Sequence, residues 1–166
     1  MNNNKPIDPK IIEYQTNLLQ QLISDVHNCC TDRVYLEAKM FQLPAAELKC
    51  LMLFEGHKYL TGMEIAGLLE VAKSRATVII SGLEDKGLVQ RATDPNDGRS
   101  KIVSLTPAGQ KKVREIEDFT FHLHQQLLSK IEPVKRPGVI DALEILKNSM
   151  EKMKGQLTSE SISQKG

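Results

Sequence analysis

Residues 60–109 read LTGMEIAGLLEVAKSRATVIISGLEDKGLVQRATDPNDGRSKIVSLTPAG, and this stretch decides the fold. Its first helix starts at Thr61, because Thr61 and Glu64 have the spacing of a capping box, in which each side chain bonds to the backbone N–H of the other residue. Apolar side chains then follow at helical spacing, at Ile65, Leu68 and Leu69. The stretch therefore opens with a short amphipathic helix, which a connection at 70–73 joins to a second one.

The second helix is predicted over about residues 72–86 and ends at Gly87, a residue type suited to the left-handed position after a helix. At about 100° per residue, one arc is apolar and is expected to face the core: Ala76, Ile79, Ile80 and Leu83. The opposite arc is small and mildly polar, with Arg75 on its flank: Ser74, Thr77, Val78, Ser81 and Asp85. Such a face is typical of a helix that reads DNA, since short side chains let base edges approach, but it also fits an ordinary solvated helix.

A β-hairpin follows this helix pair. Two β-type runs, 88–91 and 101–105, enclose the turn-forming segment ATDPNDGRS. Its charged side chains include Arg91 and Lys101 at the strand ends and Asp97 and Arg99 near the tip. An arginine on a stiff hairpin suits the narrow minor groove of DNA, while Asp97 is placed to bind loop N–H groups or to orient an arginine. The hairpin therefore favours the DNA-reading interpretation of the preceding helix.

Long helices are predicted on both sides of this module. Two precede it, over 9–40 and 44–55, and two follow it, over 106–131, with Thr106 as N-cap, and 139–155. The apolar stripe of the first helix is Ile12, Leu19, Leu22, Ile23, Val26, Cys30 and Val34. The last helix has a heptad-like seam of Leu143, Leu146, Met150, Met153 and Leu157. This seam fits packing within one chain, but terminal helices beside a small module have little else to cover them, which favours a second subunit.

The predicted fold is mainly α with a small β-hairpin wing (α+β), a winged helix-turn-helix with flanking dimerisation helices. A single domain is expected over residues 1–166. Its parts are an N-terminal dimerisation helix at 6–43, the winged helix-turn-helix DNA-binding region at 44–109, C-terminal dimerisation helices at 110–157 and a flexible tail at 158–166.

Charge and composition agree with this organisation. The chain has 22 basic and 21 acidic residues, but residues 61–114 hold nine Lys or Arg against six Asp or Glu, an excess of three positive charges in the proposed reading module. No run approaches the roughly 18 apolar residues that span a membrane, and the N-terminus has no apolar signal core. We expect a cytoplasmic protein without a cofactor. It is not expected to be an enzyme, because no nucleophile is paired with a base.

The cysteines suggest a sensor as a second possibility. Cys29 and Cys30 are adjacent in the first helix and Cys50 lies in the second, so oxidation would add bulk or a crosslink. Adjacent side chains on a helix diverge, and a disulfide partner would therefore be Cys50 or another subunit. Buried packing explains the same residues without chemistry. His122 and His124 do not share a helix face, so a metal site would need His27 or cysteines from elsewhere, and none is assigned.

Three runs resemble the MarR family of multiple-antibiotic-resistance regulators of bacteria and archaea: GLVQR at 87–91, DPNDGR at 94–99 and LTPAG at 105–109. The resemblance implies a dimeric transcription factor, usually a repressor, often released from DNA by a small molecule or by oxidation. It places Ser74, Arg75, Thr77 and Val78 in the major groove, Asp97 as a structural acid of the wing and Arg99 in the minor groove. Similar proteins carry Ser or Thr where this chain has Ala72, a poorer helix cap by about 1 kcal/mol, and Ser74 offers an alternative helix start.

The expected function is sequence-specific binding of a pseudo-palindromic operator by a homodimer that a small-molecule effector releases. Candidate contacts on the helix are Lys73, Ser74, Arg75, Thr77, Val78 and Ser81, and those on the wing are Arg91, Asp97, Arg99, Ser100 and Lys101. One alternative is a thiol-redox or metal-responsive repressor that acts through Cys29, Cys30 and Cys50. The other is a winged-helix module that binds protein and not DNA, against which the basic residues of the helix and hairpin argue.

Overall fold

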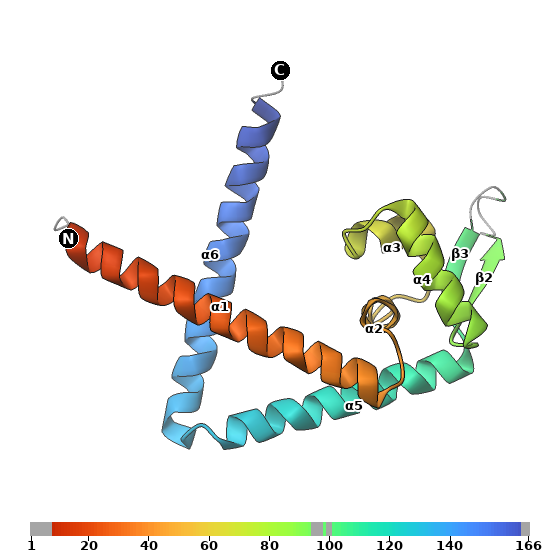
Figure 1. Cartoon of the computed structure of the whole chain (residues 1–166), viewed down its shortest axis with the longest axis horizontal. Helices are drawn as coiled ribbons and strands as arrows, with labels where there is room; N and C mark the ends of the chain where they lie inside the picture. Colours follow the sequence, from red (N-terminus) through yellow and green to blue (C-terminus); the bar gives the residue numbers. More distant parts are fainter. Residues whose placement is uncertain (1–7, 94–97, 99–100, 164–166) are drawn as a thin grey trace. The chain divides into compact units, whose positions relative to one another are not determined.

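The computed structural model describes residues 8–93, 98 and 101–163, with side chains as far as residue 156 in the last helix (Figure 1). In chain order the elements are α1 (Pro9–Met40), α2 (Ala45–Met52), β1 (Leu60–Thr61), α3 (Gly62–Leu68), α4 (Lys73–Asp85), β2 (Val89–Thr93), β3 (Lys101–Leu105), α5 (Pro107–Ser129), the 3-10 turn η1 (Pro133–Lys135) and α6 (Arg136–Ser163). The chain divides into two compact units, residues 1–116 and 117–166, with the division inside α5. The prediction of a mainly helical fold with a small sheet is confirmed.

The hydrophobic core belongs to the first unit, where α2, α3, α4, the sheet and the first turns of α5 meet. The four residues predicted to form the inner face of α4 are all buried. Other side chains that are almost fully buried are Leu51, Ile65, Val103 and Ile116. Burial of each such side chain contributes about 2 kcal/mol. The core therefore fixes the buried face of α4 and leaves its opposite face to solvent.

The bounds of α1 agree with the prediction, whereas α2 is shorter than predicted. Asp8 caps α1 by accepting the Lys10 N–H at 3.0 Å, and Pro9 takes the first position. Helix α2 was predicted over 44–55 but ends at Met52. The reason is that the next three N–H groups bond three residues back rather than four, which tightens the chain into a turn that reaches Gly56 at φ +77°.

The capping box at the start of α3 is present as predicted. Glu64 N donates to the Thr61 hydroxyl at 3.2 Å, and Thr61 N donates to the Glu64 carboxylate at 2.7 Å. That backbone N–H holds the pKa of the Glu64 carboxyl below its usual range. The prediction that Leu68 belongs to the apolar stripe is wrong, because its side chain is 54% exposed, and Ala66 is buried instead.

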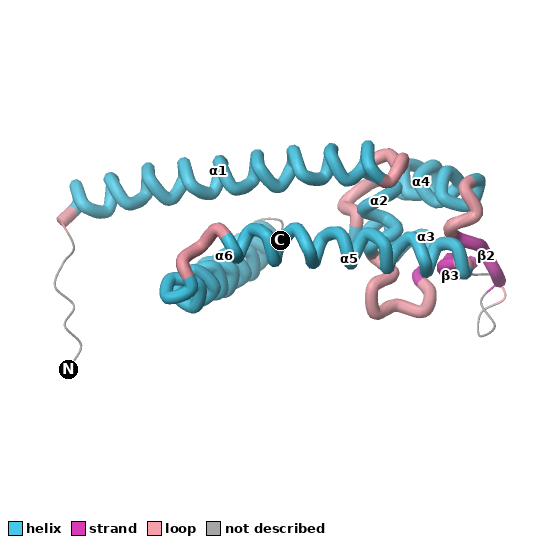
Figure 2. The backbone as a smooth tube through the Cα atoms, turned by 90° about the horizontal axis from the view of Figure 1, so that it is seen from below, coloured by secondary structure: helices cyan, strands magenta, loops and turns pink. Residues whose placement is uncertain are grey.

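The hairpin forms the larger part of a three-stranded antiparallel sheet in the order β1-β3-β2. Strand β2 covers 89–93, not the predicted 88–91, and pairs with β3 from Val89 opposite Leu105 to Thr93 opposite Lys101. Strand β1, which the sequence analysis missed, pairs Leu60 with Val103. Figure 2 shows the strands gathered beside α3 and α4, which both contact the sheet.

The base of the hairpin is joined to α4 and α5 by backbone hydrogen bonds and by the side chain of Thr106. Gly87 has φ +68°, and the N–H of Leu88 bonds to the carbonyl of Leu83 at 3.0 Å, so α4 ends at the predicted glycine. Thr106 caps α5, since its hydroxyl accepts the Gly109 N–H at 3.0 Å and donates to the Gly87 carbonyl at 2.6 Å. One threonine thus connects the end of α4 to the start of α5.

The second unit contains the end of α5, η1 and α6. Helix α6 was predicted over 139–155 but begins at Arg136 and continues to Ser163, through part of the predicted flexible tail. Pro137 lies in its first turn, where a missing N–H costs no helical hydrogen bond, so the helix begins before this proline and not after it as predicted. In the predicted seam, Leu143, Met150 and Met153 are 51–60% exposed and Leu146 is half-buried, while the side chain of Leu157 lies outside the described residues. No described helix combines the length and apolarity needed to cross a membrane.

Candidate nucleic-acid interface

Helix α4 presents the predicted polar face to solvent. It begins at Lys73, one residue after the Ala72 N-cap, which makes no side-chain capping bond, so Ser74 does not shift the helix start. The exposed residues of its first half are those predicted to contact bases: Lys73, Ser74, Arg75, Thr77 and Val78. Val78 is 61% exposed, and its neighbours one turn earlier on the same face, Ser74 and Arg75, are exposed as well. An exposed apolar group between hydroxyls and cations suits thymine methyl contacts.

The hydroxyl of Thr77 is already used within the helix. It donates to the carbonyl of Lys73 at 3.0 Å. Its oxygen keeps acceptor capacity, and so it is better suited to accept from a base amino group than to donate to a phosphate.

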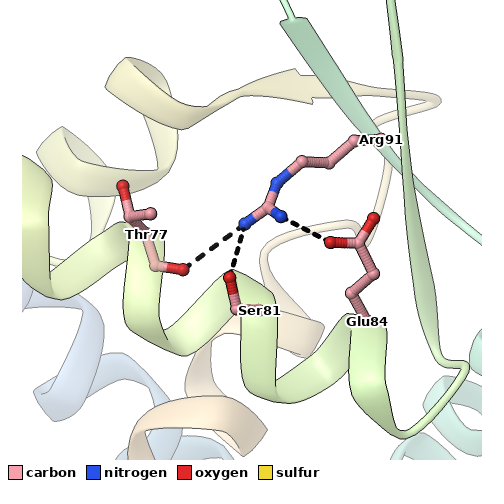
Figure 3. A network of polar contacts seen from close by, with 4 residues as sticks. All are labelled: Thr77, Ser81, Glu84 and Arg91. Carbon is pink, nitrogen blue, oxygen red and sulfur yellow. Dashed lines mark hydrogen bonds and ion pairs between the residues drawn. The ribbon is translucent and has the colours of Figure 1, made fainter.

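Arg91 was predicted as a DNA contact of the wing, but its guanidinium reaches α4 (Figure 3). Nη1 forms an ion pair with the carboxylate of Glu84. Nη2 donates to the Ser81 hydroxyl at 3.0 Å and to the carbonyl of Thr77 at 3.4 Å. Two predicted DNA contacts, Arg91 and Ser81, therefore bond to each other in this structure, and sequence analysis gave Glu84 no role.

The rest of the predicted wing is described only in part. Lys101 is exposed and donates to the hydroxyl of Thr93, its partner across the hairpin, at 2.7 Å. Asp97, Arg99 and Ser100 lie outside the described residues, so the predicted minor-groove contact at the wing tip stays a prediction.

A second ion pair, between α2 and the end of α4, was not predicted. Lys86 Nζ lies 2.9 and 3.1 Å from the two carboxylate oxygens of Glu47, a residue that is only 8% exposed. The carboxylate also lies against Gly82, where a Cβ would come too close to Glu47 Oε1. A glycine in the middle of a helix was the one signal in the sequence that indicated such a close approach.

The three cysteines have different environments. Cys29 and Cys30 are exposed on α1, whereas Cys50 is completely buried in α2. Burial, and secondarily the charge of Glu47, raise the pKa of the Cys50 thiol to about 12. Buried packing thus describes Cys50 but not the adjacent pair. Among the described residues, no three His, Cys, Asp or Glu side chains gather where they could hold a metal ion.

We predict that Cys50 resists alkylation in the folded protein. With a pKa of about 12, about one thiol in ten thousand is ionised at pH 8, and only the thiolate reacts. Iodoacetamide labelling followed by peptide mass spectrometry should modify Cys50 at least about 1,000-fold more slowly in buffer than in urea. A native rate within ten-fold of the rate in urea would contradict its burial.

The comparisons with known proteins agree with this geometry. Residues 41–100 match the model of the MarR family. The HTH-type transcriptional regulator YfiV of Bacillus subtilis is 29% identical over 108 residues, which are 65% of this chain and 68% of YfiV. Two further curated regulators match over 49% and 55% of their own lengths. The structure of MarR from E. coli is 25% identical, with a TM-score of 0.65 over 80% of this chain and 95% of MarR. A point mutant of MepR from S. aureus, bound to an oligodeoxyribonucleotide, is 21% identical with a TM-score of 0.59 over 84% of this chain and 97% of MepR.

The fold and the exposed face of α4 define a winged helix-turn-helix protein of the DNA-binding class. Within that class, residues 41–100 match the MarR family, and the chain is similar to HTH-type transcriptional regulators and to MarR itself.

Proposed function

We propose that this regulator is a homodimeric repressor that binds a pseudo-palindromic operator through α4 and the wing and leaves it when a small molecule binds. The observation that carries the DNA-binding part is the exposed face of α4, on which Lys73, Arg75 and Val78 all lie outside the core. The MepR mutant bound to an oligodeoxyribonucleotide supports duplex DNA as the ligand. Repression and an effector rest on the family resemblance.

The dimer is supported by apolar faces on α1 and on α6, each exposed within its own unit. On α1, Ile12, Leu19, Leu22 and Val26 are 45–57% exposed, and all belong to the predicted stripe. On α6, considered by itself, Leu143, Met150 and Met153 are 51–60% exposed. Monomeric proteins rarely leave such continuous apolar faces in water, and two-fold dimers are the commonest way to cover them. A two-fold dimer presents two copies of α4 to two half-sites.

A random-duplex selection with the purified protein tests this proposal. We expect enrichment of an inverted repeat whose half-sites are about one helical turn, roughly 10 base pairs, apart. Its affinity should far exceed that for a scrambled duplex and should fall steeply with salt, because each phosphate contact releases counterions. Failure to enrich any sequence, in reduced and in oxidised buffer, would overturn the proposal.

Arg75→Ala should lower discrimination at one or two base pairs of each half-site, by about 1–3 kcal/mol per position. The reason is that Arg75 is exposed beside the small residues of α4, where its guanidinium can bond a guanine edge. Binding to a panel of single-base operator variants measures this. Arg114→Ala, which removes an equal charge from α5, is the control and should keep the base preference. Equal loss on every duplex would make Arg75 a phosphate contact.

A thiol-responsive repressor is a second candidate, favoured by the exposure of Cys29 and Cys30. In that case, oxidation of this pair would release the operator, and a Cys29→Ser, Cys30→Ser double variant would stay bound in oxidant. Cys50 is not part of this candidate, because its buried thiol is not ionised at neutral pH.

A further inference from the structure

We propose that Arg91 is a positioning residue, which fastens the wing to the DNA-reading helix α4 through Glu84 and Ser81 and does not itself bind a phosphate. This inference rests on the proposed function, since it assigns a role within DNA binding. It replaces the DNA contact that charge alone suggests for Arg91. It also explains why an acidic residue, Glu84, stands on a helix that reads DNA.

The geometry is that of one side chain that bridges two elements. Arg91 lies in β2, and its three partners all belong to α4, where Thr77, Ser81 and Glu84 follow one another at intervals of four and three residues. Residues at this spacing lie along one face of a helix. From one position in β2, the guanidinium therefore contacts residues that span about two turns of α4, as Figure 3 shows. A planar group held at three points fixes orientation better than a single ion pair.

The charges argue against a phosphate contact by the same side chain. Both terminal nitrogens of Arg91 are occupied by partners within the chain. If the guanidinium turned to a phosphate, the Glu84 carboxylate would be left near the DNA without its counter-charge, and like charges repel. The Arg91 and Glu84 side chains are 31% and 37% exposed, so the pair adds little to the free energy of unfolding. Its role is to fix the orientation of β2 against α4.

The bridge joins the two surfaces that have to meet DNA together. The carbonyl of Thr77 that accepts from Arg91 lies in the same turn as the exposed residues of the α4 face. Arg91 lies two residues before Thr93, the last residue of β2. The contacts of Arg91 therefore hold the end of this strand of the wing in place against α4. Lys86 follows Glu84 by two residues, which places it about 200° around the helix axis from Glu84, and it bonds Glu47 on α2. The helix is thus held on opposite sides by two ion pairs, one from α2 and one from the wing.

A charge swap separates positioning from phosphate binding. Arg91→Glu and Glu84→Arg should each lower affinity for the selected operator, by at least about ten-fold for Arg91→Glu, whereas the double variant should return to within about three-fold of wild type. The slope of log affinity against log salt should be equal for wild type and double variant. If Arg91 binds a phosphate, the double variant will bind as weakly as Arg91→Glu and will lose about one unit of slope for each lost contact.

The control for specific rescue is Lys101→Glu, alone and combined with Glu84→Arg. Lys101 is a wing cation whose hydrogen bond goes across the hairpin to Thr93 and not to α4. Adding Glu84→Arg should therefore raise its affinity for the operator no more than its affinity for scrambled DNA, where the change of two charge units acts without sequence preference. Rescue of Lys101→Glu equal to that of Arg91→Glu would overturn the positioning role.

A measurement without DNA keeps the inference apart from the proposed function. Hydrogen exchange of the β2 and β3 amides should be at least about three-fold faster in each single variant and return to the wild-type rate in the double variant. If wild type binds no duplex but exchange follows this pattern, the operator proposal fails while the bridge between β2 and α4 stands. Equal exchange in all four proteins would overturn the bridge, whatever the DNA results.

Discussion

Replacing Gly109 with alanine is expected to lower the free energy of unfolding by about 3 kcal/mol. Gly109 is the third residue of α5 and lies against the hairpin base, where a Cβ would overlap the carbonyl oxygen of Leu88 and press on Leu105. That carbonyl cannot move aside easily, since it accepts the Thr106 N–H at 3.0 Å. Urea unfolding at a fixed protein concentration measures the loss.

The sign of this effect is the informative part. Alanine normally stabilises a helix over glycine by up to about 1 kcal/mol. Gly67 in α3 is the matched control, because a Cβ there would meet no atom within 4 Å, and Gly67→Ala should be neutral or stabilising. If Gly109→Ala were as stable as Gly67→Ala, the close contact between α5 and the hairpin base would be wrong. The glycine of the LTPAG run thus has a steric reason in this chain.

Features that depend on neighbours in sequence were predictable. Helix α1, the Thr61 capping box, the inner face of α4, the stop at Gly87 and the Thr106 cap all follow from residue type at a fixed spacing, and the structure confirms each. Local spacing decides them because the helix and cap hydrogen bonds that form them span five residues or fewer. The class of the site followed from the same patterns.

Features that depend on contacts between distant segments were not predictable. Strand β1 has two residues, too few for an alternating pattern, and exists because β3 lies beside it. The Glu47–Lys86 pair joins positions 39 residues apart. Arg91 was assigned to DNA because it is a cation in a hairpin, and only the structure shows that the face of α4 beside it carries the Glu84 carboxylate.

Leu19→Glu is expected to convert the protein to a monomer at micromolar concentration and to weaken operator binding by at least about 100-fold, because two half-sites held together bind far more tightly than one. Leu19 lies in the middle of the α1 stripe and is 46% exposed in the single chain. The glutamate is therefore tolerated within the protomer, but its charge would be buried without a partner in a dimer interface. Light scattering after size exclusion gives the mass, and titration of the selected duplex gives the affinity.

The control variant is Gln21→Glu, which introduces the same charge at an exposed residue about 200° around the helix from Leu19. It should remain a dimer with wild-type affinity. Circular dichroism must show the same helix content in both variants, so that loss of α1 itself is not mistaken for loss of pairing. A dimeric Leu19→Glu protein with full affinity would contradict the proposed interface. A monomer that keeps the base preference of one half-site would instead show that α4 and the wing recognise the bases. The pairing of two chains would then account for the gain in affinity.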